Sequence, residues 1–484
     1  MRRYYIPVVF VFIIGFFFRI YNISTKPDLY VDELIYVSLA ENWLKYQTLK
    51  LHGFNENFFY HPFLGMLMIA SWFKFFGVGF TQARVLSVLL ATFTMGILYL
   101  IGARKSTTAG LLTLVIFATD PLIVYVNRLV LLENISNFFA ILGIYLMVLM
   151  FNLKERKRYS GILLIGVSFG LAITTKLTYL FVILLLLGFV YPFRRLTIKE
   201  LLVSVSFALL VLGIWVSYGL GLSLNPDQII IQTLSQFLRT QGALKISTGF
   251  TVNTLFESIF EKLYVYSLTF IILTVGVIYT IWNSYQIFFK NRREIIYEIQ
   301  LVWALSVIII FGGVVRLLHE QYMYTIYSPF ILGTGFLLDD AISYFVSKYK
   351  SMERFAKPAV HTILILIIVL NYNSWSDRYI YSEDDAMFST LEYINNNIPK
   401  NAVIYTEQDI ISRISHKSVD LWTEHDPDML ATQDISYMVA SDYWIHFIQE
   451  NPLLKKFVDD NFKLVRVFKG YTIKQTIYIY IRKT

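Results

Sequence analysis

The sequence predicts a polytopic α-helical membrane protein that ends in a small α/β domain. Three observations lead to this fold class: the composition, a series of long apolar segments, and a change of charge near residue 374. The chain has 484 residues, of which 56% are hydrophobic and 16% are charged. Soluble domains are about 45–50% apolar and about 25% charged. This composition argues against both a soluble globular protein and a disordered chain.

Apolar segments long enough to span a bilayer recur along the first three quarters of the chain. A spanning helix needs about 20 mostly apolar residues. The first segment begins at Tyr5, and we expect it to be a retained anchor because no small-residue cleavage site follows it. The candidate spans are 5–21, 81–103, 108–126, 134–152, 160–175, 177–192, 201–221, 263–289, 298–315, 322–340 and 359–373. Several are short or adjoin one another, so we predict about eleven transmembrane helices.

Lysine and arginine gather in every second loop between these segments. These loops cover residues 104–105, 154–158, 194–199, 290–293 and 348–357, and they fall on the same side as Arg2 and Arg3. Cytoplasmic loops of membrane proteins concentrate basic residues. We therefore expect a cytoplasmic N-terminus, and the basic excess does not call for a nucleic-acid partner. An odd number of spans then puts the C-terminal residues outside, with the cell membrane as the expected location.

The predicted domains are residues 1–373, the membrane part, and residues 374–484, an extracytoplasmic domain. Residues 375–484 carry 12 basic and 16 acidic side chains, whereas the rest of the chain carries 30 and 18. Short strand-like segments alternate there with helical ones, which is typical of an α/β domain. The expected strands are 402–405, 435–440, 464–468 and 472–481, and the expected helices are 385–396 and 443–458.

The first outside loop, residues 22–80, contains a predicted amphipathic helix at 31–46 that lies at the membrane interface. Asp28 precedes this helix and is expected to cap it. Asp32 and Glu33 fall in its first turn. Neighbouring residues point about 100° apart on a helix, so only one of the two carboxylates can face a site between this helix and the bundle. The alternative is that both are solvated or capping acids.

Other polar residues mark the outer ends of the predicted spans. They are Arg84, Arg128, Glu133, Lys176, Glu320 and Tyr322. His61 instead heads a second apolar stretch of the first outside loop, at 58–72, where a lone histidine is more often a structural hydrogen-bonder than a catalyst. Ionisable residues at membrane depth are costly, and they usually pair or line a cavity. Each one alone is equally well explained by snorkelling or by a structural ion pair. Together, on one face, they predict a cationic pocket that suits a lipid phosphate.

In this order the residues resemble the GT-C membrane glycosyltransferases, in particular the protein O-mannosyltransferase and aminoarabinose-transferase group. The matching elements are Asp32-Glu33, His61-Pro62, Ala83-Arg84 with Ser87, Arg128 with Glu133, Gly170 to Lys176, and Tyr322 to Pro329. The family usually has Asp where Glu133 stands, and commonly Arg where Gln321 stands. The resemblance implies a GT-C-like fold, with an extracytoplasmic C-terminal domain as in members of this group. It also implies an inverting transfer of a hexosyl or pentosyl group from a polyprenyl (dolichyl) phosphate.

An outside site points to the same donor, because nucleotide sugars are too charged to cross lipid. Cations must then stabilise the leaving phosphate, and a carboxylate must take the proton of the acceptor hydroxyl. We assign the base to Asp32, with Glu33 as the alternative. The phosphate is assigned to Lys176 with Arg128, and Arg84 or Arg239 are further candidates. Three residues complete the hypothesis: Glu133 orients Arg128 or the acceptor, and His61 and Tyr322 bond the phosphate or sugar.

Some questions stay open at this level. The acceptor can be a protein, a glycan or a glycolipid. The main alternative function is a polytopic transporter or lipid flippase, which predicts inverted repeats and broken midplane helices that we do not find in the sequence. No cofactor is predicted. The sequence leaves room for a divalent metal, but Asp426-Pro427-Asp428, which has the spacing of a nucleotide-sugar metal motif, lacks a phosphate-loop context.

Overall fold

The computed structural model describes residues 5–51, 57–151, 155–222, 227–240, 266–314, 320–349, 353–382, 385–421, 423–470 and 476–483. The chain divides into two compact units. The helical unit comprises Met1–Tyr21, Phe59–Met68 and Val85–Ser374. The mixed unit comprises Asn22–Phe58, Ile69–Arg84 and Trp375–Thr484. The first outside loop therefore belongs largely to the same compact unit as the C-terminal residues, a grouping that sequence analysis did not anticipate.

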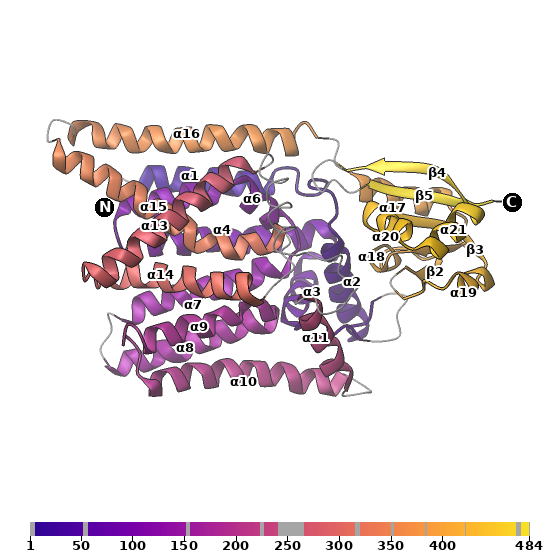
Figure 1. The fold of residues 1–484 in the computed structure, drawn as a ribbon, viewed down its shortest axis with the longest axis horizontal. Helices are drawn as coiled ribbons and strands as arrows, with labels where there is room; N and C mark the ends of the chain where they lie inside the picture. Colours follow the sequence, from indigo (N-terminus) through magenta and orange to yellow (C-terminus); the bar gives the residue numbers. More distant parts are fainter. Residues whose placement is uncertain are drawn as a thin grey trace. The chain divides into compact units, whose positions relative to one another are not determined.

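The helical unit consists of helices that run alongside one another (Figure 1). They are α1 (Tyr5–Ile20), α4 (Phe80–Gly102), α5 (Thr107–Thr119), α6 (Pro121–Arg128), α7 (Leu132–Met150), α8 (Glu155–Thr175), η2 (Leu177–Leu180), α9 (Phe181–Val190), α10 (Ile198–Leu222), α11 (Asp227–Thr240), α13 (Ser267–Phe289), α14 (Ile295–Ile309), η3 (Ile310–Val314), α15 (Glu320–Lys348) and α16 (Glu353–Tyr379). The first residues of α4 and the last of α16 belong to the mixed unit.

Among the described residues, eight helices are long and apolar enough to cross a membrane, or nine if the bent pair α5–α6 is one span. The two helices of that pair meet at 60°. Each of the eleven predicted segments corresponds to a described helix or bent pair, but two of those helices, α1 and η2–α9, are short. The predicted polytopic helical class is confirmed, whereas the number of about eleven spans stays a prediction.

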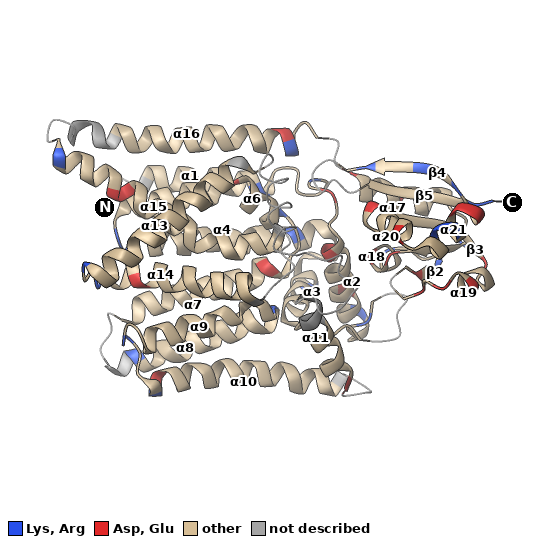
Figure 2. Cartoon of the chain, in the orientation of Figure 1, with Lys and Arg blue, Asp and Glu red and all other residues tan. Residues whose placement is uncertain are grey.

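Small residues allow these helices to approach closely, as they do in other membrane proteins. A Cβ atom on Gly166 of α8 would lie 2.4 Å from the carbonyl oxygen of Ser204 on α10. A Cβ on Gly276 of α13 would lie 2.4 Å from the carbonyl oxygen of Phe330 on α15. No larger residue fits at either crossing without moving backbone. Figure 2 shows uninterrupted stretches without charged residues along α10 and α13.

Ion pairs join the predicted cytoplasmic loops at one end of the helical unit, which we call the basic end. The pairs are Lys105–Asp339 at 2.8 Å, Arg158–Glu200 at 2.5 Å and Arg195–Glu298 at 2.9 Å. They connect the end of α4, the beginnings of α8, α10 and α14, and the last turns of α15. The basic loops that alternate along the sequence therefore gather in space within this unit, as a single membrane side requires.

The mixed unit contains a five-stranded sheet in the order β2-β1-β3-β5-β4. Its strands are β1 (Val403–Thr406), β2 (Lys417–Asp420), β3 (Ile435–Ser441), β4 (Phe462–Lys469) and β5 (Thr476–Arg482). The strands β2, β1 and β3 are parallel, and β5 pairs antiparallel with β3 and β4. The predicted small α/β domain is confirmed. Strand β2 was missed, because only Val419 of its four residues is fully buried and it shows no alternation.

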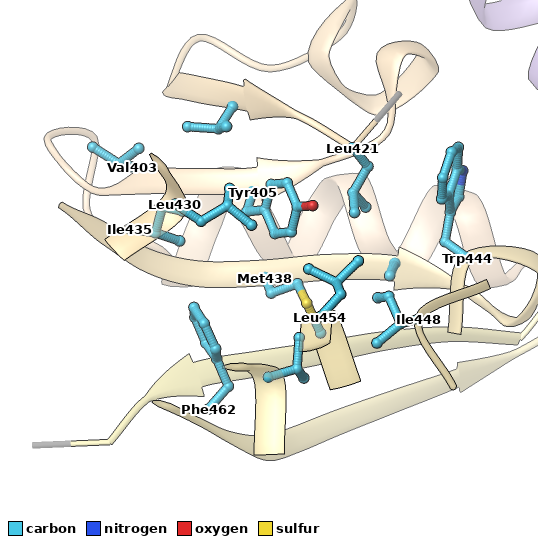
Figure 3. Packing of buried hydrophobic residues seen from close by; sticks show 13 residues of the cluster. Val403, Tyr405, Leu421, Leu430, Ile435, Met438, Trp444, Ile448, Leu454 and Phe462 are labelled. Atoms are coloured by element: carbon cyan, nitrogen blue, oxygen red, sulfur yellow. The ribbon is translucent and has the colours of Figure 1, made fainter. Parts of the chain in front are cut away.

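Helices cover this sheet. They are α17 (Ala386–Asn397), α18 (Gln408–Ile411), α19 (Pro427–Thr432), α20 (Asp442–Glu450) and α21 (Pro452–Asn461). The single helix predicted at 443–458 is two helices, since Asn451 caps α21 through Leu454 N–H and Pro452 occupies its first turn. Figure 3 shows one of the two cores, in which Tyr405, Met438 and Trp444 pack together. The unit also contains α2 (Val31–Tyr46) and most of α3 (Leu64–Phe76).

Candidate functional site

The acidic helix α2 begins where the sequence predicts, and its two adjacent carboxylates differ in environment. Tyr30 is its N-cap residue, and the Glu33 carboxylate accepts the Tyr30 N–H at 3.1 Å, which is half of a capping box. Glu33 is completely buried, whereas Asp32 is partly exposed. Of the two candidates for the base, Asp32 is thus the one that solvent and a substrate can reach.

Arg84 lies at the centre of the contacts that hold the start of α2. Its guanidinium bonds the Glu33 carboxylate twice, at 2.9 Å and 2.7 Å. It also donates to the carbonyl oxygens of Ile23, Pro27 and Asp28 at 2.9–3.2 Å. An arginine has five N–H donors, and these bonds use all of them. Because no donor remains for a phosphate, Arg84 is better explained as part of a structural ion pair than as a phosphate-binding residue.

Asp28 has a different partner from the one predicted. Its carboxylate accepts N–H groups from Leu29, Met387 and Phe388 at 2.7–3.2 Å. Met387 and Phe388 lie in the first turn of α17. The prediction that Asp28 caps α2 is wrong, because the carboxylate is already engaged by a helix about 360 residues further along the chain.

In the helical unit, Glu133 and Lys176 form a buried ion pair. Glu133 lies in the first turn of α7, and Lys176 follows the last residue of α8. Their side chains are 0% and 2% exposed, and the ammonium donates to the carboxylate. Since α8 begins at the basic end, Lys176 lies at the opposite end of this unit. The Lys176 ammonium also lies 4.7 Å from the ring centroid of Tyr322, in a cation–π contact.

Two polar residues beside this pair were missed by sequence analysis. The Tyr179 hydroxyl lies 2.6 Å from the Thr325 hydroxyl and donates to the Glu133 carbonyl at 3.3 Å. Both residues are buried. Tyr179 belongs to a segment that was interpreted only as a span, and Thr325 lies within the matching element Tyr322 to Pro329 but was not singled out. A signal existed in retrospect: Tyr179 follows Lys176 by three residues, and Thr325 follows Tyr322 by three. In helical structure this spacing puts side chains on one face.

Arg128 contacts the end of α1. Its guanidinium donates to the carbonyl oxygens of Phe18 at 2.7 Å and Tyr21 at 2.6 Å. Arg19 similarly donates to carbonyls at the end of α5, including Ala118 at 2.7 Å. The last carbonyls of a helix lack intrahelical donors. Both arginines thus satisfy helix ends, and Lys176 is a partner of Glu133.

The remaining predicted residues are placed as follows. His61 is partly exposed. It follows Phe59, whose N–H is accepted by the Gln232 side chain of α11 at 2.5 Å. Arg239 lies in α11 and Glu320 begins α15, but their side chains are outside the described residues. Much of the predicted outside loop at 222–262 is also outside them.

The structure gives Asp426-Pro427-Asp428 a local role. Asp426 is the N-cap of α19, and its carboxylate accepts the Asp428 N–H at 3.0 Å. Across the described ranges, no group of three or more His, Asp or Glu side chains is arranged to hold a metal ion.

Comparison with known proteins identifies relatives of the chain. Residues 60–218 match the family model described as dolichyl-phosphate-mannose-protein mannosyltransferase. ArnT from Cupriavidus metallidurans, solved bound to undecaprenyl phosphate, is similar over 98% of this chain and 97% of that chain, with 12% identity and a TM-score of 0.61. AglB from Archaeoglobus fulgidus, solved with an inhibitory peptide and a dolichol-phosphate, is similar over 98% and 73%, with 13% identity and a TM-score of 0.61. No curated protein sequence matches.

These findings agree with one another. The matched segment 60–218 contains His61, Arg84, Arg128, Glu133 and Lys176. The structural similarity extends over nearly the whole chain, including the sheet of the mixed unit, and identities this low speak for the fold. The chain has the GT-C fold of these solved structures, and its residues 60–218 resemble the dolichyl-phosphate-mannose-protein mannosyltransferase family.

Proposed function

We propose that this enzyme transfers a sugar from a polyprenyl phosphate to a hydroxyl group on the outer face of the membrane. The observation that carries this proposal is the Lys176 ammonium. It is buried at the end of the helical unit opposite the basic end, between the Glu133 carboxylate and the face of Tyr322. A cation held there in a low-dielectric setting suits the developing charge of a leaving phosphate.

Asp32 is the proposed base. Its carboxylate takes the proton of the acceptor hydroxyl while that oxygen attacks the anomeric carbon of the donor sugar. The bond from this carbon to the phosphate oxygen breaks, and polyprenyl phosphate leaves with the bonding electron pair. A single displacement of this kind inverts the anomeric configuration. Phosphate is a good leaving group, so the reaction needs no general acid.

The other site residues divide into two roles. We propose that Tyr322, His61 and Arg239 contact the donor. Glu320, at the start of α15, precedes Tyr322 by two residues and is a further candidate. Glu133 fixes the Lys176 ammonium, and Arg84 fixes Glu33 and the segment before α2. Arg128 supports the end of α1. This division moves Arg84, Arg128 and Glu33 from direct substrate contact to positioning.

The orientation follows from the basic loops. We propose that the basic end of the helical unit is cytoplasmic and that Lys176 lies at the outer face, in the cell membrane. Nucleotide sugars do not cross lipid, so the donor is a lipid-linked sugar. The solved relatives bound to undecaprenyl phosphate and to a dolichol-phosphate are consistent with this choice. The transporter alternative is not favoured, because the relatives found are glycosyltransferases.

A transfer assay with purified protein in lipid nanodiscs tests the proposal. A panel of undecaprenyl and dolichyl phosphate sugars is offered with peptide, glycan and glycolipid acceptors, and mass spectrometry detects the products. We expect at least one donor to be consumed by the wild-type protein and not by Lys176→Ala. The matched control is Lys290→Ala, which removes an exposed lysine at the basic end. Unchanged consumption by Lys176→Ala, or no consumption of any donor by the wild type, would contradict the proposal.

A further inference from the structure

Helix α17 receives its N-terminal cap from a distant residue. Its own N-cap residue, Asp385, makes no side-chain capping hydrogen bond. The Asp28 carboxylate instead accepts the N–H groups of Met387 at 2.7 Å and Phe388 at 3.2 Å. These are the second and third residues of the helix, whose N–H groups a capping side chain normally accepts. Asp28 therefore caps α17 in place of Asp385.

The backbone of Asp28 is held by Arg84, which also holds Glu33 at the start of α2. The Asp28 side chain is 1% exposed, and its carbonyl oxygen accepts a hydrogen bond from Arg84 at 3.2 Å. The same guanidinium bonds Glu33, one residue after Asp32. Residue 28 thus links the start of α17 to the start of α2, four residues before the proposed base.

Apolar packing reinforces this link. Leu29 and Leu34, on either side of the α2 start, are buried in the second core of the mixed unit. Their partners in that core come from α17, α18 and the sheet, and they include Met387, Ile394 and Ile410. The acidic helix is therefore part of the hydrophobic core of the C-terminal α/β fold.

Polar contacts fix the middle of α2 as well. The Ser38 hydroxyl donates to the Ser412 carbonyl at 3.5 Å. Glu41 pairs with Arg413 at 3.2 Å. The Arg413 guanidinium lies 4.4 Å from the ring centroid of Phe80, at the start of the helix that carries Arg84. Residues that directly follow α18 therefore contact α2 at Ser38 and Glu41, beyond the turn that Leu34 anchors in the core.

We infer that the C-terminal α/β fold positions the acidic helix α2, and that Asp28 is the positioning residue that sets the place of Asp32. The catalytic consequence rests on the proposed function, whereas the mechanical coupling does not. Asp28 acts through its accepted hydrogen bonds and transfers no proton. This separates it from Asp32, for which the charge is essential.

Three variants test the inference: Asp28→Ala, Asp28→Asn and the matched control Asp385→Ala. Asparagine keeps one oxygen that can accept N–H groups but sets an NH2 group in place of the other, so the activity of Asp28→Asn should lie between that of wild type and that of Asp28→Ala. Asp28→Ala should lower kcat by about tenfold, which is the fold-change equivalent of the free energy lost with a helix N-cap. The KM for the donor should stay within about twofold of the wild-type value. Asp385→Ala should leave both unchanged, because Asp385 makes no capping bond.

Hydrogen–deuterium exchange gives a readout that does not depend on sugar transfer. In Asp28→Ala, amides at 29–36 and 386–389 should both exchange faster, and the helices of the helical unit should be unaffected. Faster exchange at 386–389 alone would overturn the coupling, whereas unchanged kcat in Asp28→Ala would overturn the positioning role. An Asp28→Asn variant as inactive as Asp28→Ala would also overturn the positioning role. If the wild type consumes no donor, the proposed function fails, and exchange alone still decides the coupling.

Discussion

Each unit of the protein contains a buried ion pair, and the two pairs are built differently. In the mixed unit, the Glu33 carboxylate is held by an arginine whose five donors are all used. In the helical unit, the Glu133 carboxylate is held by a lysine that also faces an aromatic ring. A planar guanidinium whose donors are all used holds its partners in one arrangement, whereas a compact ammonium with three rotatable donors can also donate to a ligand.

This difference assigns the pairs to different tasks. Removing two charges from water costs several kcal/mol per ion, and extra hydrogen bonds must offset this cost. Arg84 gains them from three backbone carbonyls, so its pair stabilises one conformation of the segment before α2. Lys176 pairs with Glu133, faces the ring of Tyr322 and lies in the segment that matches the mannosyltransferase family model. We therefore interpret the first pair as a brace and the second as part of the donor site.

The strongest way to break this comparison is to remove the brace. Arg84→Met leaves the Glu33 carboxylate buried without its partner, and breaking a buried pair in this way costs about 3–5 kcal/mol. We expect a large loss of stability in the mixed unit, measured by thermal unfolding and by exchange of residues 23–33. The double variant Arg84→Met/Glu33→Leu removes both charges and should recover the part of the loss that the unpaired carboxylate causes, but not the part from the three carbonyls that Arg84 satisfies. Equal stability of Arg84→Met and wild type would contradict the brace.

The neighbouring carboxylates offer the next largest effect. Asp32→Asn removes the proposed base, and general base catalysis contributes about 10²–10⁴-fold. We expect kcat to fall about 10³-fold while the unfolding temperature stays within about 2 °C of wild type, because Asp32 is partly exposed. Glu33→Gln should show the reverse pattern, with a larger loss of stability than of kcat per folded molecule. Unchanged turnover in Asp32→Asn would remove the base assignment.

Asp409 sharpens the comparison, because this carboxyl in the mixed unit is buried without a cationic partner in the described structure. Burial, with the nearby Asp420 and Asp32 carboxylates, raises its pKa to about 7 from the ordinary 3.8. The folded state therefore favours the protonated form. The protein therefore keeps its full stability below about pH 4, where Asp409 is protonated in the folded and the unfolded state. Its stability declines as the pH rises toward 7, because the unfolded state loses this proton first, and the loss is complete above about pH 7.

Asp409→Asn tests this directly, since an amide stays neutral at every pH. We expect the free energy of unfolding of the variant to match that of wild type near pH 4 and to exceed it by about 2 kcal/mol at pH 8. This difference is within the free energy that corresponds to the pKa shift of Asp409. Thermal unfolding across this pH range measures the difference. A wild-type stability that rises between pH 4 and 7 in step with Asp409 titration would contradict the sign.

The smallest expected effect concerns the surroundings of the lysine pair. Tyr179→Phe removes the hydroxyl that lies 2.6 Å from Thr325. A buried hydrogen bond of this kind contributes about 1 kcal/mol. We expect a stability loss of that size and a KM for the donor that changes by less than about threefold. A loss of more than a hundredfold in kcat would instead make Tyr179 a catalytic residue.

Local patterns were enough to predict much of the fold. The apolar segments, the alternation of basic loops and the spacing of residues 31–46 each depend on neighbours in the sequence. The same reasoning singled out Glu133 and Lys176, but it assigned Asp28 to α2 and did not foresee the contacts of Arg128 with the end of α1. Those contacts depend on which distant backbone groups lack partners within their own helices: the α1 carbonyls that Arg128 satisfies, and the α17 N–H groups that Asp28 accepts. Such demands arise only after packing.

Strand β2 and the grouping of residues 22–58 with the C-terminal fold were unpredictable for the same reason. Strand β2 has four residues and is recognisable only from its pairing with β1. Leu29 and Leu34 look like interfacial residues in sequence, yet they are buried with Met387 and Ile394. The candidate site residues could be nominated from residue type and order, whereas the proposed division into a brace and a donor contact is argued from the geometry.

The most direct test of the central claim is the affinity of the purified protein for undecaprenyl phosphate. Native mass spectrometry or a thermal-shift titration in nanodiscs can compare wild type with Lys176→Met and Arg84→Lys. The account predicts that Lys176→Met weakens binding at least tenfold and that folded Arg84→Lys binds like wild type. Equal affinity of Lys176→Met and wild type would contradict the account, because the buried ammonium would then have no part in holding the phosphate.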